Sequence, residues 1–228
     1  MNSTNSRQST VSLTDWQRAF IDFCLHKNVL QFGNFTLKSG RQSPYFFNAG
    51  HFDDGQSQQK IGEIYARTLI ESNLPFNMIF GPAYKGIPLA TSTSYALSAA
   101  FDRNVPFAFN RKEVKDHGEG GQIVGAKLSG DVVLVDDVIT AGTAIRETLS
   151  LLEGYPEAKL VAAVVLIDRQ EKLEGSDYSA IQALEKEFNL QILPAIRLDQ
   201  IIEHIREMPE FAEHLPQIEQ YRQKYGIE

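Results

Sequence analysis

Two adjacent acids follow a continuous apolar run in the second half of the chain. Residues 132–135 have the pattern of a buried strand, and Asp136 and Asp137 come directly after them. A turn containing Gly142 then leads into a helix predicted over about 143–153. Substrate sites in open parallel sheets lie at the carboxyl ends of the strands. This pattern therefore predicts a ligand site at the end of the strand.

The residue types of this segment suit a sugar phosphate. The backbone N–H groups of Thr140–Ala144 can cradle a phosphate, and the hydroxyls of Thr140 and Thr143 add donors. Asp136 and Asp137 can accept hydrogen bonds from two ribose hydroxyls, or hold a metal ion through water. A ribose 5-phosphate satisfies both halves together. The alternative is that Asp137 and the threonines only cap the helix, but two crowded acids are electrostatically costly without a partner.

Two further segments combine cations with glycines. The turn Gly81–Gly86 follows a short apolar run, and Lys85 places a cation where the backbone can approach a diphosphate. Alone, this turn can equally be an ordinary one. The stretch Arg111–Ala126 holds four glycines among charges and shows no helical or strand period, which predicts a long irregular loop. Its cations suit a lid over a charged leaving group, although a solvated loop explains them as well.

Alternating strands and helices position these segments. A capping box, Thr14-x-x-Gln17, predicts a first helix, and aromatics among Gly and Pro near 30–50 predict short strands and turns. Apolar runs then predict strands near 76–80, 105–109, 131–135, 160–167 and 190–196, and helical periods predict helices near 58–71, 88–100, 143–153, 178–188 and 199–207. This order predicts βαβ units and an α/β fold with a parallel sheet flanked by helices.

Composition narrows the classes of function. The 228 residues are 43% hydrophobic and 22% charged, which is ordinary for a globular chain of one large domain. The net charge of −7 argues against nucleic acid as a partner. Cys24 is the only cysteine, so an internal disulfide is excluded. Residues 1–12 are expected to be a disordered polar tail, and no apolar run suits a membrane span, so we expect a cytoplasmic protein.

The segment around Asp136 and Asp137 resembles the 5-phosphoribosyl 1-diphosphate (PRPP) signature of the type I phosphoribosyltransferases. The chain is also similar, from about Leu13 to its end, to bacterial and fungal orotate phosphoribosyltransferases. The similar stretches, in that family's order, are FTLKSGR (35–41), SPYFFNAG (43–50), GPAYKGIPLA (81–90), FNRKEVKDHGEGG (109–121) and IDRQE (167–171). The resemblance implies a single domain over 13–228 with a Rossmann-like sheet, a small N-terminal hood near 30–50 and a flexible lid over 111–126.

The resemblance also implies a reaction and its participants. The 5-phosphoribosyl group of PRPP is transferred to orotate, giving orotidine 5'-monophosphate and pyrophosphate in UMP biosynthesis. Mg²⁺ is carried by PRPP, with no direct protein ligand assigned to the metal. The enzyme is a homodimer in which each lid reaches the neighbouring subunit's site, and it needs neither nucleic acid nor a membrane.

The family's functional residues match positions of this chain one by one. For PRPP binding these are Lys38, Tyr84, Lys85, Arg111, Lys112, Lys115, His117, Asp136, Asp137, Val138, Ile139, Thr140, Ala141, Gly142, Thr143 and Ala144. For orotate binding they are Phe46, Phe47, Thr140 and Arg169. For catalysis they are Lys115, His117 and Asp137.

Three alternatives remain at this point. A purine or uracil enzyme shares the signature, but it leaves the orotate-like segments around Phe46 and Arg169 unexplained. A regulatory protein that only binds PRPP usually adds a nucleic-acid-binding module, and this acidic chain has no room for one. A bifunctional protein with a decarboxylase needs more than 228 residues.

Overall fold

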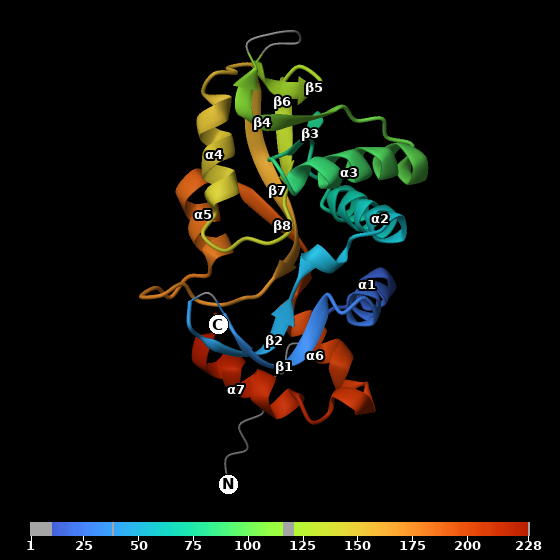
Figure 1. Cartoon of the computed structure of the whole chain (residues 1–228), viewed down its shortest axis with the longest axis vertical. Coiled ribbons are helices and arrows are strands. Elements are labelled where there is room, and N and C mark those ends of the chain that lie inside the picture. Colours follow the sequence, from blue (N-terminus) through green and yellow to red (C-terminus); the bar gives the residue numbers. More distant parts are fainter. Residues whose placement is uncertain (1–10, 38, 116–120, 228) are drawn as a thin grey trace.

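The computed structural model describes residues 11–37, 39–115 and 121–227, with the backbone alone at Val114 and Lys115. It shows a six-stranded sheet with helices on both faces and a separate two-stranded sheet near the N-terminus (Figure 1). The predicted α/β class with a flanked sheet is confirmed. Most of the predicted polar tail, residues 1–10, lies outside the described residues.

The elements follow the predicted order. Helices cover Asp15–His26 (α1), Gly55–Glu71 (α2), Gly86–Phe101 (α3), Thr143–Leu152 (α4), Ala180–Phe188 (α5), Leu198–Arg206 (α6) and Leu215–Tyr225 (α7). Strands cover Leu30–Thr36 (β1), Gln42–Phe47 (β2), Met78–Gly81 (β3), Phe107–Lys115 (β4), Gly121–Gly125 (β5), Gly130–Val135 (β6), Ala158–Asp168 (β7) and Gln191–Arg197 (β8). The capping box at the start of α1 is present, since Thr14 and Gln17 bond each other's backbone reciprocally.

The large sheet has the strand order β5-β4-β3-β6-β7-β8. Neighbours from β4 to β8 pair in parallel, as predicted, and β5 adds an antiparallel edge. The chain runs outward from β3 to β4 on one side, and then returns to the other side of β3 for β6, β7 and β8. The order therefore reverses between β3 and β6, which is where open α/β sheets bind their ligands.

Two apolar layers cover the faces of this sheet. Val133 and Val135 of β6 belong to the layer that contains α2 and α3, whereas Val132 and Leu134 belong to the layer of α4 and α5. All four side chains are fully buried. Because successive strand residues point to opposite faces, a strand covered on both sides must be apolar throughout. This explains the continuous apolar run that predicted β6.

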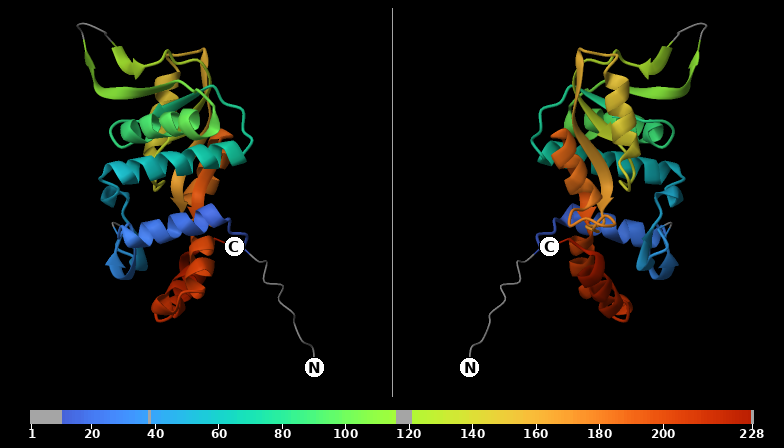
Figure 2. Two further views of the ribbon diagram at one scale, coloured as in Figure 1. Left: turned by 90° about the vertical axis from the view of Figure 1, so that its right-hand side faces the viewer. Right: turned by 90° about the vertical axis from the view of Figure 1, so that its left-hand side faces the viewer.

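The stretch 111–126 differs from its prediction. An irregular loop was expected, but β4 runs on to Lys115 and β5 pairs antiparallel with it from Gly121 to Gly125. Figure 2 shows this hairpin projecting from one end of the molecule. Its residues are exposed or half-buried on both faces, so no alternation of apolar and polar residues marks the strands. Residues 116–120 lie outside the described part.

The N-terminal hairpin and the last helix form the other end of the molecule (Figure 1). Strands β1 and β2 pair antiparallel in the region where short strands were predicted, and α7 packs on β2. The sequence analysis did not predict α7. Among the described residues, no helix is both long and apolar enough to span a membrane.

Candidate active site

Two loops meet where the strand order reverses. The first follows β3 and contains Pro82–Lys85, and the second follows β6 and contains Asp136–Gly142. The helices that follow them, α3 and α4, lie on opposite faces of the sheet, which opens a crevice between the loops.

Glycines and a neighbouring strand fix the first loop. A Cβ on Gly81 would lie 2.0 Å from the carbonyl oxygen of Gly86, and a Cβ on Gly86 would lie 2.7 Å from the carbonyl carbon of Gly81, so both ends of the loop require glycine. Inside the loop, the N–H of Ala83 donates to Oδ1 of Asn110 on β4 at 2.8 Å. The sequence analysis did not single out Asn110. With the backbone held in this way, the side chain of Tyr84 is left 68% exposed beside the crevice.

The second loop ends in a helix start without a side-chain cap. Gly142 is the N-cap of α4 with a φ of 72°, and a Cβ there would lie 2.6 Å from Leu184. No side chain caps this terminus, so its N–H groups stay open to an anion. The alternative that Asp137 and the threonines only cap the helix is therefore wrong.

The two acids have separate partners instead. The buried Asp137 accepts from Lys85 Nζ at 2.5 Å through Oδ2, and from the N–H of Val138 at 2.9 Å through Oδ1. Oδ1 of Asp136 accepts from the N–H of Asp137 at 2.9 Å. The Tyr65 hydroxyl donates to the backbone oxygen of Asp136 at 2.7 Å. The Lys85–Asp137 ion pair thus joins the two loops.

The surroundings of Asp136 raise its pKa above the ordinary value of an aspartate. Burial, and next the charge of Asp137, raise the pKa of Asp136 to about 6. A carboxyl group whose pKa is higher in the folded protein than in the unfolded chain destabilises the fold once it ionises. The free energy of unfolding should therefore fall as the pH rises from about 4 to above 6.

The Asp136→Asn variant should accordingly be more stable than the wild type at pH 8, on the order of 2 kcal/mol. The amide keeps an oxygen for the N–H of Asp137 and carries no charge. Urea unfolding at fixed protein concentration, from pH 4 to pH 8, measures the difference between the two proteins. The difference should shrink toward zero at pH 4, and a difference independent of pH would contradict the assignment.

The crevice holds a cavity of about 370 Å³. It is lined by Pro82, Ala83, Tyr84, Lys85, Lys112, Asp136, Val138, Ile139, Thr140, Gly142, Thr143, Ala144 and Glu147. Most of the residues expected to bind PRPP are therefore brought together, and Asp137 supports them through Lys85. Lys112 reaches the cavity from β4, with its ammonium 5.2 Å from the centre of the Tyr84 ring. Pro82, Ala83 and Glu147 are lining residues that the sequence analysis did not identify.

Of the residues expected to bind orotate, Thr140 lines this cavity, whereas Phe46, Phe47 and Arg169 lie outside the lining. Phe46 stacks on Phe35 with ring centres 5.5 Å apart, and Phe47 is packed in the core. Arg169 follows β7, and its guanidinium donates to the Tyr45 hydroxyl and to Glu171. A bridge between Val138 and Ile167 aligns the ends of β6 and β7, so Arg169 emerges at the same sheet edge as the second loop, the expected PRPP loop.

Three residues of the expected site are not placed by side chain. Lys38 and His117 lie outside the described residues, and Lys115 is described by its backbone, as the last residue of β4. Arg111 lies on the same strand and donates to the backbone oxygen of Gly121 at 3.3 Å. The roles of Lys38, Arg111, Lys115 and His117 remain predictions.

Comparison with known proteins identifies the family. A model of the phosphoribosyl transferase domain matches residues 51–195. Orotate phosphoribosyltransferases of Cronobacter sakazakii and Proteus mirabilis are 52% and 53% identical over 212 residues, which cover 93% of this chain and 99% and 98% of theirs. The crystal structure of the orotate phosphoribosyltransferase of Francisella tularensis superposes with a TM-score of 0.83 at 42% identity, covering 91% of this chain and 99% of that one.

These matches span both the crevice and the N-terminal hairpin, and their sequence identities lie between 42% and 53%. They also decide among the alternatives left by the sequence, since the similar relatives act on orotate and are of nearly the same length as this chain. The chain belongs to the orotate phosphoribosyltransferase family of the type I phosphoribosyltransferases.

Proposed function

We propose that the crevice between β3 and β6 holds PRPP while its 5-phosphoribosyl group is transferred to orotate. The protein is an orotate phosphoribosyltransferase of pyrimidine biosynthesis, so its products are orotidine 5'-monophosphate and pyrophosphate. The observation that carries the proposal is the uncapped start of α4 in one cavity with Asp136, beside the Asp137–Lys85 ion pair. A phosphate and a ribose diol are the groups that such a site recognises.

Each part of PRPP has a matching set of residues. The 5-phosphate is assigned to the N–H groups and hydroxyls of Thr140–Ala144, at the positive end of α4. The ribose hydroxyls are assigned to Asp136 and Asp137. The diphosphate is assigned to Tyr84 and Lys85, whose side chains are both 68% exposed on the first loop.

The residues present fit a magnesium ion carried on the diphosphate. Mg²⁺ in phosphate-transfer sites is usually held by one or two carboxylates together with substrate oxygens. Asp136 and Asp137 offer two such carboxylates, and the described residues contain no cluster of three or more metal-ligating side chains. When bound, the metal would neutralise charge on the leaving pyrophosphate.

The transfer requires the protein to position the reactants and to stabilise the charge that develops on the leaving group. A ring nitrogen of orotate forms a bond to the anomeric carbon as the bond from that carbon to the diphosphate breaks. The described residues hold the ribose and phosphate groups in place, which supplies the proximity contribution. Lys85 and Lys112 line the cavity and can stabilise the negative charge that grows on the leaving group.

Orotate is assigned to the sheet edge between the PRPP loop and the N-terminal hairpin. Thr140 lines the cavity at that edge, and Arg169 emerges from β7 beside it. A guanidinium can hold a carboxylate with two parallel hydrogen bonds, and the carboxylate is what distinguishes orotate from uracil. Phe46 and Phe47 supply the aromatic wall on the hairpin side.

The hairpin β4–β5 is the proposed lid, and we assign the protein to a homodimer in the cytoplasm. Lys112 lines its own subunit's cavity, whereas Arg111 lies outside that lining and donates to the backbone oxygen of Gly121. Cations on a hairpin that projects from the molecule (Figure 2) support a lid that reaches the neighbouring subunit's site.

A spectrophotometric assay of purified protein tests these assignments. Orotate absorbance should fall when PRPP and Mg²⁺ are both present, and it should stay constant when a chelator removes the metal. Uracil and a purine base should not be ribosylated under the same conditions. Transfer to uracil at a rate close to that with orotate would contradict recognition of the carboxylate.

A further inference from the structure

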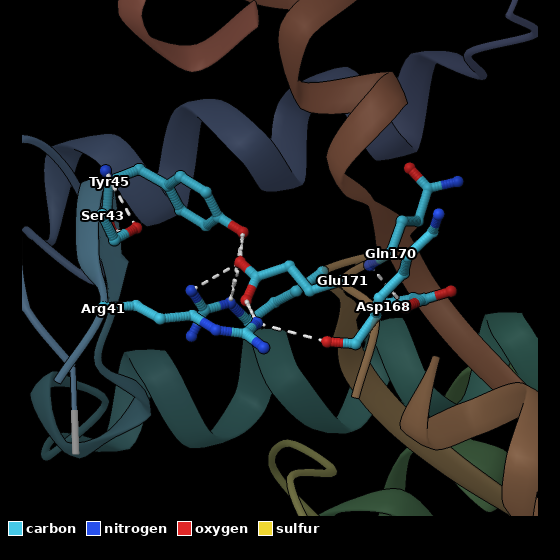
Figure 3. Close-up of polar contacts among 8 residues, drawn as sticks. Arg41, Ser43, Tyr45, Asp168, Gln170 and Glu171 are labelled. Carbon is cyan, nitrogen blue, oxygen red and sulfur yellow. Dashed lines mark hydrogen bonds and ion pairs between the residues drawn. The ribbon is translucent and has the colours of Figure 1, made fainter. Parts of the chain in front are cut away.

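Arg169 is not free to turn, because two side chains already hold one edge of its guanidinium. Its Nε lies 3.0 Å from Oε1 of Glu171 and 3.1 Å from the Tyr45 hydroxyl, and its Nη2 lies 2.7 Å from the same Oε1. The Tyr45 hydroxyl donates to Oε1 of Glu171 at 2.6 Å. Figure 3 shows the Glu171 carboxylate facing both Tyr45 and Arg41.

These contacts leave the other edge of the guanidinium available. An arginine has five N–H donors, and Glu171 and Tyr45 engage those on the side of Nε. Among the described residues, Nη1 of Arg169 has no hydrogen-bond partner. The edge formed by Nη1 and the second hydrogen of Nη2 can donate two parallel hydrogen bonds to a carboxylate.

The cluster also carries one surplus positive charge. Arg41 Nη1 lies 4.0 Å from Oε2 of Glu171, so two guanidinium groups share one carboxylate. Burial raises the pKa of Tyr45 well above its usual value, so this hydroxyl stays neutral. The Arg41 and Arg169 side chains are 22% and 24% exposed. A partly buried surplus charge is costly until a partner of opposite sign arrives, and orotate brings one carboxylate.

The end of the chain fixes the segment that carries these residues. The N–H of Lys172 donates to the backbone oxygen of Tyr225 at 2.8 Å, and the N–H of Ile227 donates to that of Gln170 at 2.9 Å. The ring of Tyr221 packs edge-on against Tyr45. Glu171 is therefore held from both sides, and its side chain is only 13% exposed.

We propose that Glu171 and Tyr45 are positioning residues that present the Nη edge of Arg169 to the orotate carboxylate. Neither residue touches the substrate in this arrangement, since both act on the opposite edge of the guanidinium. The inference rests on the proposed role of Arg169. It adds that recognition of the carboxylate depends on Tyr45 of β2 and on Glu171, whose segment is held in place by the C-terminal segment.

The Glu171→Gln variant tests the proposal through the sign of its effect. The amide removes the charge, so the cluster changes from one to two surplus positive charges. A charge effect alone would lower the KM for orotate, whereas loss of positioning raises it. We expect the KM for orotate to rise roughly ten-fold, with kcat and the KM for PRPP changed by less than about two-fold. A lower KM for orotate, or equal changes for both substrates, would overturn the proposal.

Asp199→Asn is the matched control. Asp199 pairs with Arg197 at the end of β8 with the same two-residue spacing, at 3.1 Å, and its side chain is also 13% exposed. This variant removes a similar ion pair one strand away, outside the residues assigned to the site. Its KM for orotate should stay within about two-fold of the wild type. An increase as large as that of Glu171→Gln would mean that the effect is general.

Three more variants keep the outcome decisive. If Glu171→Gln does not fold, Tyr45→Phe removes only the hydroxyl and should still raise the KM for orotate roughly three-fold. In an Arg169→Ala background, Glu171→Gln should change that KM by less than about two-fold, since it acts through the missing arginine. If Arg169→Ala leaves the KM for orotate unchanged, the proposed role of Arg169 fails. If Arg169→Ala raises it and Glu171→Gln does not, only the positioning role fails.

Discussion

The Arg169→Ala variant should raise the KM for orotate by roughly 30- to 1000-fold, equivalent to about 2–4 kcal/mol, the range for removing one partner of a buried charge pair. The loss is large because the orotate carboxylate would enter a partly dehydrated site without its fork. The KM for PRPP should change much less, because the phosphate and ribose contacts belong to the loops after β3 and β6. Steady-state kinetics with each substrate varied in turn measure both constants.

The arginine also stabilises the fold, so the variant needs a structural control. Without Arg169, the buried Glu171 retains Arg41 as its cation at 4.0 Å. Urea unfolding should therefore accompany the kinetics, and Arg197→Ala provides a variant that loses a comparable ion pair at the end of β8. If Arg169→Ala shifts the KM values of orotate and PRPP equally, the effect belongs to the sheet edge as a whole rather than to the carboxylate.

The parts of the fold that follow from local pattern could be predicted from the sequence. The run at 132–135 is apolar because both faces of β6 are covered, and that burial makes the strand visible without an alignment. The acid pair and Gly142 then mark the site, since the following helix needs a glycine N-cap and leaves its N–H groups open. These signals are short-range, so they survive in the sequence alone.

Other elements depend on contacts that no local pattern encodes. The strands of the proposed lid are exposed or half-buried, so no apolar period reveals them. The helix α7 has few buried residues, and packs by Ile218 and Tyr221 against elements near the N-terminus. Asn110 supports the first loop from a strand 27 residues away. Such residues become visible only once the sheet order is known.

The environment of Arg169 shows the same limit within the site. Family resemblance selected the arginine, but the partner that orients it, Tyr45, lies 124 residues earlier in the chain. Glu171 is close in sequence, yet its acid could equally have been a solvated surface group. Its burial between two arginines and Tyr45 is a property of the folded hairpin and the C-terminal segment.

The second large effect concerns the proposed lid and the way in which two subunits assemble. Lys115→Ala should lower kcat at least ~100-fold if this lysine stabilises the leaving diphosphate, the scale for losing one charge-stabilising donor. Asp137→Asn should impair PRPP use, because it removes the carboxylate that holds Lys85 at 2.5 Å. In the proposed homodimer, each variant then has every site damaged, one variant in the proposed lid and the other in the loop after β6.

Mixing the two variants should restore activity, up to roughly a quarter of the wild-type value. In a two-fold dimer the interface is self-complementary, so both lids cross or neither does. If they cross, a mixed dimer has one site with an intact loop and an intact lid, and one site with both defects. Random exchange makes half of the dimers mixed, and half of their sites are then whole. Differently tagged subunits establish that exchange has occurred. Mixed dimers that form but stay inactive would show that each lid serves its own subunit, because every site would then retain one defect. The proposed chemistry of the crevice would still stand.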